Sequence, residues 1–184
     1  MARLYLVRHG KAAAGFGGAT DPGLDALGHK QAAEVAEKLG GLGPLPILTS
    51  PLRRTRETAK PLAAAWSREP AVEKAVAEIP SPEGMTPEQR VNWLKTLMTG
   101  SWRDVNVRLA QWREAVIAAL AAQQKDAVIF SHYVAINVAA GAALGDDHVA
   151  VFAPDNCSVT IVEVTDGALR LVEKGREADL TKVN

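Results

Sequence analysis

Three short apolar runs, each followed at once by polar residues, mark the chain. They occupy residues 4–7, 46–48 and 127–130, and each has the length and apolar content of a buried β-strand. Arg8 follows the first run directly, and Ser131 follows the third. The pattern predicts three strands that stop where charged and hydroxyl groups begin.

Helical spacing of apolar residues fills the segments between these runs. Apolar positions recur from about residue 25 to 39, and the Gly40–Gly41 pair then supplies a stop. Thr86 and Gln89 have the spacing of a capping box, which opens a helix to about residue 98. Two further predicted helices are one that carries Leu109, Trp112, Val116 and Leu120 on one face, and one of small residues from Tyr133 to Leu144.

Prolines shape the segment after the second strand. Ser50 suits an N-cap and Pro51 the first helical position, so we expect a helix to open there. We expect Pro61 to break or kink this helix, because proline lacks the amide proton that a helix interior needs. The proline-rich stretch 70–87 is predicted to be mostly irregular.

The pattern changes to a hairpin near the end of the chain. Residues 158–164 and 168–173 are predicted as two strands, with Asp166–Gly167 at the turn. Strands alternate with helices over most of the chain before this point. We therefore expect an α/β fold, a three-layer α/β/α arrangement around a mixed, mostly parallel central sheet. The length of 184 residues suits a single domain over 1–184.

Composition narrows the class of partner. The chain has 21 Lys and Arg against 21 Asp and Glu, so it has no global attraction for nucleic acid or an anionic membrane. The single cysteine, Cys157, allows no intramolecular disulfide and fits a reducing compartment. No apolar run approaches the roughly 18 residues of a membrane helix, and the first run is too short for a signal peptide. We expect a cytoplasmic protein.

Candidate chemistry follows from the polar residues at the strand ends. In α/β folds, sites lie beyond the carboxyl ends of the strands. The clusters Arg8–Gly10, Ser50–Arg54 and Ser131–His132 are therefore predicted to meet at one edge of the sheet. Arginines match phosphate oxygens two at a time, and histidine can act as a nucleophile or a proton carrier. A predicted helix start at Ser50 would also favour an anion.

Other phosphate and metal chemistries fit less well. The chain has no Walker-type motif and no Gly-x-Gly-x-x-Gly fingerprint. The four histidines have no His-x-x-x-His spacing. A zinc site is disfavoured, because His9 and His132 are expected beside arginines that repel a cation.

These segments resemble the histidine phosphatase superfamily, which includes the cofactor-dependent phosphoglycerate mutases. Leu6–Gly10 looks like the family's Arg-His-Gly segment, and Ser50–Ala59 is similar to its Ser-x-Leu-x-Arg-[Ala/Thr]-x-x-Thr-Ala segment. Phe130–His132 resembles the strand that ends in Ser-His, and Gly28–Ala32 matches Gly-x-x-Gln-Ala. The matches span most of the chain in the expected order, and they imply a phosphoglycerate mutase-like fold.

The resemblance implies roles for individual residues. His9 would attack phosphorus and become phosphohistidine, Arg8 and Arg54 would hold the phosphoryl oxygens, and His132 would add a hydrogen bond and charge. Water would then release phosphate from His9. The implied reaction needs neither a metal nor a cofactor, because the arginines take that place.

The general acid and the substrate are less specified. The family usually places a Glu after the second cluster; Glu78 fits best and Glu83 is the rival, while some members lack this acid. Lys11 and Tyr133 depart from the family pattern, and Tyr133 is expected to line the substrate site. We expect specificity to depend on residues 15–21, on 78–100 and on Tyr133.

Three functions remain open at this point. The resemblance favours a metal-independent phosphatase that acts on a phosphomonoester, such as a phosphorylated small molecule, or on a phosphohistidine of a phosphoprotein. The alternatives are a phosphoglycerate mutase-type phosphotransferase and a non-catalytic module that binds a phosphorylated ligand. The oligomeric state stays open.

Overall fold

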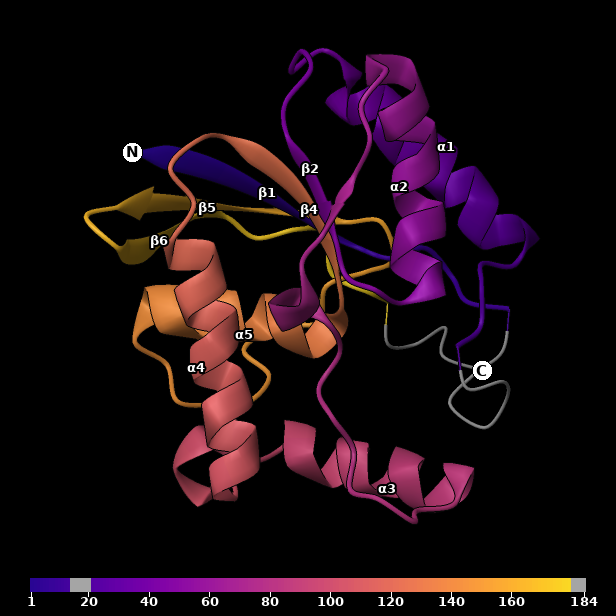
Figure 1. Cartoon of the computed structure of the whole chain (residues 1–184). Helices are drawn as coiled ribbons and strands as arrows, with labels where there is room; N and C mark the ends of the chain where they lie inside the picture. The colour runs from indigo at the N-terminus through magenta and orange to yellow at the C-terminus, as the bar shows by residue number, and fades with distance from the viewer. Residues whose placement is uncertain (14–20, 180–184) are drawn as a thin grey trace.

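The computed structural model describes residues 1–13 and 21–179 and centres on a six-stranded sheet (Figure 1). The strand order is β3-β2-β4-β1-β5-β6. The strands are β1 (Ala2–Arg8), β2 (Ile47–Thr49), β3 (Ala71–Val72), β4 (Ala127–Ser131), β5 (Val159–Thr165) and β6 (Ala168–Glu173). The α-helices are α1 (Ala26–Gly40), α2 (Arg53–Trp66), α3 (Pro87–Met98), α4 (Val107–Ala121) and α5 (Tyr133–Leu144), with single 3-10 turns at Lys74–Val76 and Trp102–Asp104.

The sheet is mixed, as the sequence pattern predicts. Strand β1 pairs in parallel with β4, β4 with β2, and β2 with β3. Strand β5 runs antiparallel to β1, and β6 runs antiparallel to β5. The parallel strands β1, β2 and β4 therefore end at the same edge of the sheet, which is the arrangement that the polar clusters require.

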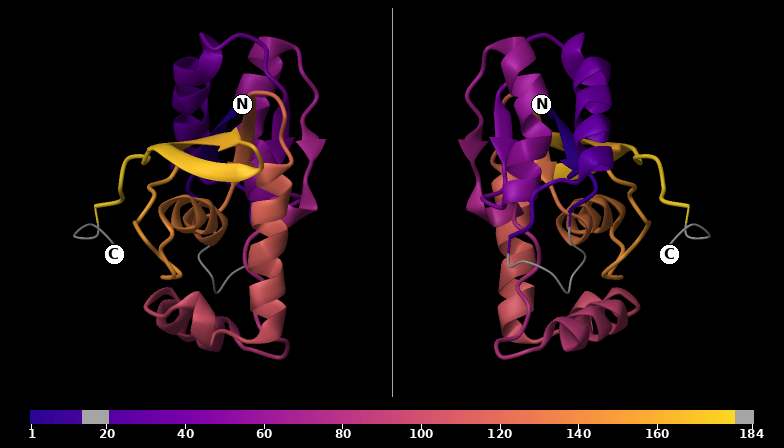
Figure 2. Two further views of the ribbon diagram at one scale, coloured as in Figure 1. Left: turned by 90° about the vertical axis from the view of Figure 1, so that its left-hand side faces the viewer. Right: turned by 90° about the vertical axis from the view of Figure 1, so that its right-hand side faces the viewer.

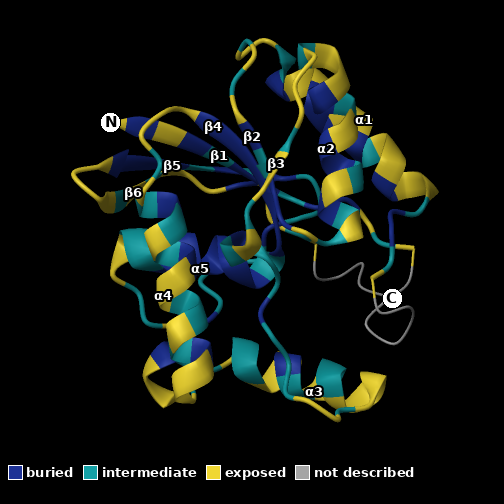
Figure 3. Ribbon diagram, in the orientation of Figure 1, coloured by how far each residue is buried: buried dark blue, intermediate teal, exposed yellow. Residues whose placement is uncertain are grey.

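Helices cover both faces of the sheet and give the three layers expected from the sequence. Helices α1 and α2 lie together against one face, and α4 and α5 lie on the other (Figure 2). Figure 3 shows the buried residues concentrated in the strands and on the inward sides of the helices. Side chains alternate along β1, so that Leu4 and Leu6 join the core under α4 and α5 while Val7 joins the core under α1 and α2.

Most predicted helix signals are confirmed. The Asp25 side chain accepts a hydrogen bond from the Gly28 amide and caps α1, and the capping box of Thr86 and Gln89 opens α3. Helix α4 buries Leu109, Val116 and Leu120 on one face. The hairpin turn is also as predicted, because Asp166 and Gly167 both adopt a positive φ.

The expected start of α2 is wrong, and so is the expected break at Pro61. The helix begins at Arg53 with Leu52 as its N-cap, two residues later than expected. Ser50 lies before the helix, where its hydroxyl accepts from the Leu52 amide over 3.2 Å and lies 2.8 Å from Nε2 of His132. Pro61 does not end the helix, which continues to Trp66. Leu62 beyond it is fully buried against the sheet, and this packing offsets the hydrogen bond that proline removes.

The stretch 70–87 is mostly irregular, as predicted, but it contains a strand that the sequence pattern did not reveal. Strand β3 has two residues, both exposed, and it pairs only with β2. Two exposed residues carry no alternation that a pattern could show. Within residues 1–13 and 21–179, no helix combines the length and the apolar content needed to cross a bilayer.

Candidate active site

The three polar clusters meet at the carboxyl edge of β1, β2 and β4. The His9 amide donates to the carbonyl of Ser131 over 3.1 Å, and the Ser50 amide donates to the carbonyl of Phe130 over 3.1 Å. The rings of His9 and His132 lie with their centroids 5.2 Å apart. Side chains from segments more than a hundred residues apart therefore share one site.

His9 is held in one tautomer by the backbone. Its Nδ1 lies 2.7 Å from the carbonyl oxygen of Gly10. Because a carbonyl oxygen only accepts, Nδ1 carries the proton and Nε2 keeps its lone pair. Nε of Arg54 donates a hydrogen bond to Nε2 of His9 over 3.2 Å. The Nε2 lone pair of His9 therefore accepts from a cation that can turn to hold an attached phosphoryl group.

Burial keeps the His9 imidazole neutral. The residue is 8% exposed. Burial, reinforced by the positive charges of Arg8 and Arg54, lowers the pKa of His9 from 6.5 to about 3, and the Gly10 carbonyl opposes this change. The ring is thus uncharged at neutral pH and Nε2 carries no proton, which nucleophilic attack by Nε2 requires.

His132 is fully buried and bonded to a serine. Its Nε2 lies 2.8 Å from Oγ of Ser50, and its Nδ1 is a buried atom with no hydrogen-bond partner in the described part of the chain. Burial, followed by the effects of His9, Arg54 and Arg8, lowers the pKa of His132 well below its usual value. If Ser50 donates to Nε2, Nδ1 carries the ring proton and can donate a hydrogen bond to an anionic oxygen.

Arg8 also has an unsatisfied donor. One terminal nitrogen (Nη1) donates to the carbonyl of Pro154 over 2.9 Å, and the guanidinium carbon lies 5.3 Å from the ring centre of Tyr133. Its Nε is buried and, among residues 1–13 and 21–179, has no hydrogen-bond partner. Buried polar atoms are normally satisfied. Arg8 Nε, and His132 Nδ1 in the tautomer described above, are therefore buried donors that a phosphoryl oxygen could use, since such oxygens accept several hydrogen bonds.

Of the two candidate acids, Glu78 is the one whose charge acts on both Arg8 and Arg54. Burial raises the pKa of Glu78, while the Ile79 amide and the charges of Arg54 and Arg8 oppose the change. The Glu78 carboxylate in turn raises the pKa of Arg8, against the larger effect of burial. Glu83 is exposed on the loop before α3. The raised pKa of Glu78 suits a group that gives up a proton.

Two side chains hold the backbone around His9. Thr58 accepts a hydrogen bond from the Gly10 amide over 3.0 Å, and the Asn156 side-chain amide donates to the His9 carbonyl over 2.9 Å. In the sequence Asn156 is predicted to be a turn residue, with help in ordering the site as the alternative. The approach of the segment before β5 to the end of β1 shows that it supports the His9 backbone.

The Gly-x-x-Gln-Ala segment supports the same loop. A Cβ on Gly28 would lie 2.2 Å from the Lys11 carbonyl oxygen, and a Cβ on Gly10 would lie 2.7 Å from that of Gly28. Gln31 then accepts a hydrogen bond from the Lys11 amide over 2.9 Å. The glycines let α1 approach the loop after β1 closely enough to fix its position.

The structure also bears on the expectations for Lys11, the specificity segment and a metal. The Lys11 side chain is exposed and its Nζ lies 3.6 Å from the Asp25 carboxylate, so Lys11 pairs with Asp25 and with neither histidine. Of the segment 15–21, which we expect to affect specificity, residues 15–20 lie outside the described residues. Within the described ranges no group of three or more His, Cys, Asp and Glu side chains is arranged to hold a metal ion. A metal-free reaction stays a prediction.

A family model for the histidine phosphatase superfamily (branch 1) matches residues 4–176, which include every cluster described above. The chain belongs to the histidine phosphatase superfamily. The resemblance read from Leu6–Gly10 and Ser50–Ala59 is thereby confirmed.

Relatives within the superfamily carry different activities in their names. A probable phosphoglycerate mutase, GpmB of Yersinia enterocolitica, is 34% identical over 112 residues, which cover 55% of this chain and 52% of that protein. The chain thus spans about half the length of the curated relatives it matches.

Solved structures of superfamily members match nearly the whole chain. The phosphoserine phosphatase of Entamoeba histolytica, in complex with 3-phosphoglyceric acid, has a TM-score of 0.74 and 25% identity, covering 96% of this chain and 98% of that one. A mycobacterial glucosyl-3-phosphoglycerate phosphatase in complex with VO3 has a TM-score of 0.74 and 24% identity over 96% and 100% of the two chains. At 24% identity, the similarity to the mycobacterial phosphatase shows that the two chains share a fold.

Proposed function

We propose that the chain is a metal-independent phosphatase that forms a phosphohistidine on His9 and then hydrolyses it. The observation that carries the proposal is the His9 imidazole, whose Nε2 is unprotonated and lies 3.2 Å from Nε of Arg54. A neutral nucleophile beside two guanidinium groups suits transfer of a phosphoryl group, whose charge is spread over its oxygens.

In the first step, Nε2 of His9 forms a bond to phosphorus as the bond from phosphorus to the leaving oxygen breaks. Arg8, Arg54 and Nδ1–H of His132 would hold the three phosphoryl oxygens. Glu78 gives its proton to the leaving oxygen and becomes a carboxylate. Its raised pKa keeps a larger fraction of the acid form available before the step.

In the second step, water attacks the phosphorus of phosphohistidine. The bond from phosphorus to Nε2 of His9 breaks and orthophosphate forms, while the Glu78 carboxylate takes one proton from the attacking water. Neutral His9 and protonated Glu78 are restored. Each step needs only groups that this site holds, with the arginines supplying the positive charge.

An acid at Glu78 supports a phosphomonoester as the substrate. Phosphomonoesters have an oxygen leaving group that needs a proton from Glu78, whereas protein phosphohistidine has an imidazole leaving group for which an acid matters less. The E. histolytica relative acts on phosphoserine and was solved with 3-phosphoglyceric acid, which supports a small phosphorylated acid as one candidate.

A mutase is the second candidate, supported by the similarity to a probable phosphoglycerate mutase. A mutase must keep its phosphohistidine away from water until the substrate rebinds. The segment between Glu78 and Gly100 adds one short helix, α3. We favour hydrolysis because so modest an insertion offers little chain with which to keep water from a phosphohistidine.

The test is release of phosphate from para-nitrophenyl phosphate in EDTA by the wild type, His9→Ala and His29→Ala. His29 is exposed on α1 and serves as the matched control. We expect activity in the wild type and the control and its loss in His9→Ala. Equal activity in all three contradicts the covalent role of His9.

Two further assays separate the alternatives. Interconversion of phosphoglycerates without net phosphate release indicates a mutase. Binding of orthovanadate without release or interconversion indicates a binding module. Either result contradicts the proposed hydrolysis.

A further inference from the structure

Asn137 is a buried amide in the most apolar helix of the described structure. Helix α5 has the sequence YVAINVAAGAAL, and Asn137 is fully buried among small apolar side chains. A buried amide costs free energy unless its donors and acceptors find partners. An apolar residue at this position would continue the pattern of the helix, so the amide needs a specific explanation.

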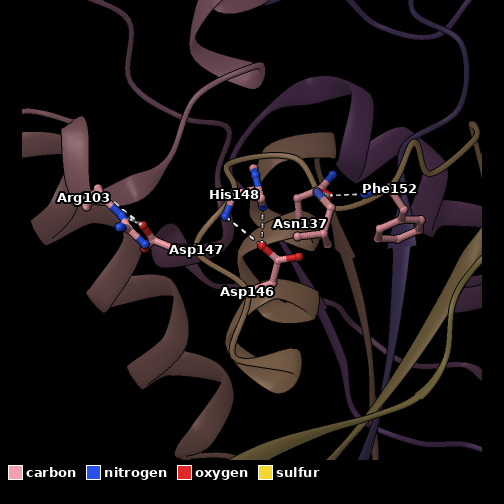
Figure 4. Close-up of polar contacts among 7 residues, drawn as sticks. Arg103, Asn137, Asp146, Asp147, His148 and Phe152 are labelled. Atoms are coloured by element: carbon pink, nitrogen blue, oxygen red, sulfur yellow. Dashed lines mark hydrogen bonds and ion pairs between the residues drawn. The ribbon is translucent and has the colours of Figure 1, made fainter.

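The Asn137 side chain joins two segments of backbone. Its Nδ2 donates to the carbonyl of Tyr133 over 3.0 Å. Its Oδ1 accepts from the amides of Val151 and Phe152 over 2.7 and 3.1 Å, the second of which is drawn in Figure 4. Both lone pairs of the oxygen are thus used to hold the segment that follows α5.

Both segments supply a contact to the guanidinium of Arg8. The Tyr133 ring lies 5.3 Å from the guanidinium carbon, and the Pro154 carbonyl, two residues after Phe152, accepts from Nη1 of Arg8 over 2.9 Å. Nε of Arg8 is buried and, in the described ranges, makes no hydrogen bond of its own. Asn137 is therefore bonded to the backbone of Tyr133, the first of these contacts, and to the backbone of Val151 and Phe152, which lead into Pro154, the second.

We infer that Asn137 is a positioning residue that sets the guanidinium of Arg8 for phosphate, an inference that rests on the proposed function. It acts through Arg8 and makes no contact with the phosphate itself. A displacement of about 1 Å in such a group is enough to cost up to about a hundredfold in rate. Loss of the Asn137 amide should therefore weaken the binding of phosphate and substrate only while Arg8 is present.

The rest of the loop has its own attachments, so loss of Asn137 should act locally. Before the Asn137 contacts, the Trp102 amide donates to the Asp147 carbonyl over 2.8 Å, and Arg103 pairs with Asp147 over 2.8 Å (Figure 4). After them, the Ala178 amide donates to the Ala153 carbonyl over 2.8 Å. Pro154 thus keeps a support beside it at Ala153, and loss of Asn137 should shift the Pro154 carbonyl by a small distance without unfolding the loop.

The test is a double-mutant cycle of Asn137→Ala and Arg8→Ala, with the affinity for orthophosphate measured by calorimetry and kcat and KM measured with para-nitrophenyl phosphate. We expect Asn137→Ala to weaken orthophosphate binding about tenfold with Arg8 present, and less than about twofold in the Arg8→Ala background. Val138→Ala, one residue further along the same buried helix, is the control for lost stability and should leave orthophosphate affinity within about twofold.

A second variant guards against misfolding. If Asn137→Ala does not fold, Asn137→Leu replaces it, because leucine has a similar volume and leaves no cavity, while it removes all three hydrogen bonds of the amide. The same dependence on Arg8 is expected. Equal losses of affinity with and without Arg8, or unchanged affinity in a folded Asn137 variant, overturn the inference.

Failure of the proposed function gives a different result. If the wild type binds orthophosphate through Arg8 but releases none from para-nitrophenyl phosphate, the phosphatase proposal fails and the binding cycle still decides the role of Asn137. If the wild type binds no orthophosphate, or Arg8→Ala binds it equally well, Arg8 has no phosphate to hold. The inference about Asn137 is then overturned as well.

Discussion

Nε of Arg54 donates a hydrogen bond to Nε2 of His9 over 3.2 Å, while Nδ1 of the same imidazole faces the Gly10 carbonyl. The two bonds together fix which nitrogen has the lone pair and which cation lies beside it. Because Arg54 comes from the first turn of α2 and His9 follows β1, the packing of that helix on the sheet sets this geometry.

The low pKa of His9 predicts how stability depends on pH. His9 has a pKa of about 3 in the folded chain against 6.5 for the free side chain. The unfolded chain therefore binds more protons between these values, and the free energy of unfolding falls as pH falls from 6.5 toward 3. At pH 5 the part due to His9 is about 2 kcal/mol.

Urea unfolding of the wild type and His9→Gln at pH 7 and pH 5 measures this effect. The difference in unfolding free energy between the two pH values should be smaller in His9→Gln by about 2 kcal/mol. The lowered pKa of His132 also makes stability fall with pH, but it does so in both proteins and so largely cancels from the comparison. Equal losses in the two proteins mean that His9 is not kept neutral by burial.

Ser50 should matter for catalysis through His132. Ser50→Ala removes the partner of His132 Nε2 and frees the ring to take the other tautomer. We expect kcat to fall by about 10- to 100-fold, because a donor to the transferring phosphoryl group is lost. The measurement is steady-state kinetics with para-nitrophenyl phosphate.

Ser131→Ala is the matched control for this variant. It also removes a buried serine hydroxyl, which donates to the Val76 carbonyl over 2.7 Å and to no imidazole. Both variants should lose about 1–3 kcal/mol of stability. The account is contradicted if the two lower kcat to the same extent.

The role of Glu78 predicts a dependence on the leaving group. Glu78→Gln cannot donate a proton, so kcat/KM for an alkyl phosphate such as phosphoserine, which reports the first step, should fall by about 100-fold or more. The kcat/KM for para-nitrophenyl phosphate should fall less, since nitrophenolate leaves without a proton. Glu83→Gln is the control, and it should match the wild type on both substrates. A larger loss in Glu83→Gln than in Glu78→Gln reverses the assignment.

Two glycines of α1 differ in what they contact. A Cβ on Gly28 would meet the Lys11 carbonyl oxygen at 2.2 Å, whereas one on Gly40 would have no atom within 4 Å. Gly28→Ala should therefore cost about 1–3 kcal/mol, and Gly40→Ala should be neutral or stabilise by up to about 1 kcal/mol. Chemical denaturation distinguishes them. A Gly28→Ala protein as stable as Gly40→Ala means that the loop after β1 adapts freely.

Much of the fold could be predicted because its strands and helices carry local signals. The runs that became β1 and β4, the cap at Asp25 and the capping box at Thr86 each depend on neighbouring residues alone. The start of α2 could not be predicted in this way. Ser50 has the chemistry of an N-cap, but its hydroxyl lies against His132, a partner 82 residues away.

The candidate site was predictable to the extent that its residues end parallel strands. His9, Arg54 and His132 follow from that rule and from the family resemblance, and the structure brings them together. Asn156 and Asn137 carry no such signal, because each contacts a segment that is adjacent only in the folded chain. Their residue type is common in turns and helices, so only the fold shows what they hold.

The most direct test of the central claim is to identify the phosphorylated nitrogen. Wild-type protein mixed with a labelled phosphomonoester and quenched in base within milliseconds should contain phosphohistidine at His9, since this linkage survives base. Because the Gly10 carbonyl holds Nδ1–H, we expect the phosphoryl group on Nε2, and none in His9→Ala. Phosphate on Nδ1, or on a residue other than His9, contradicts the account.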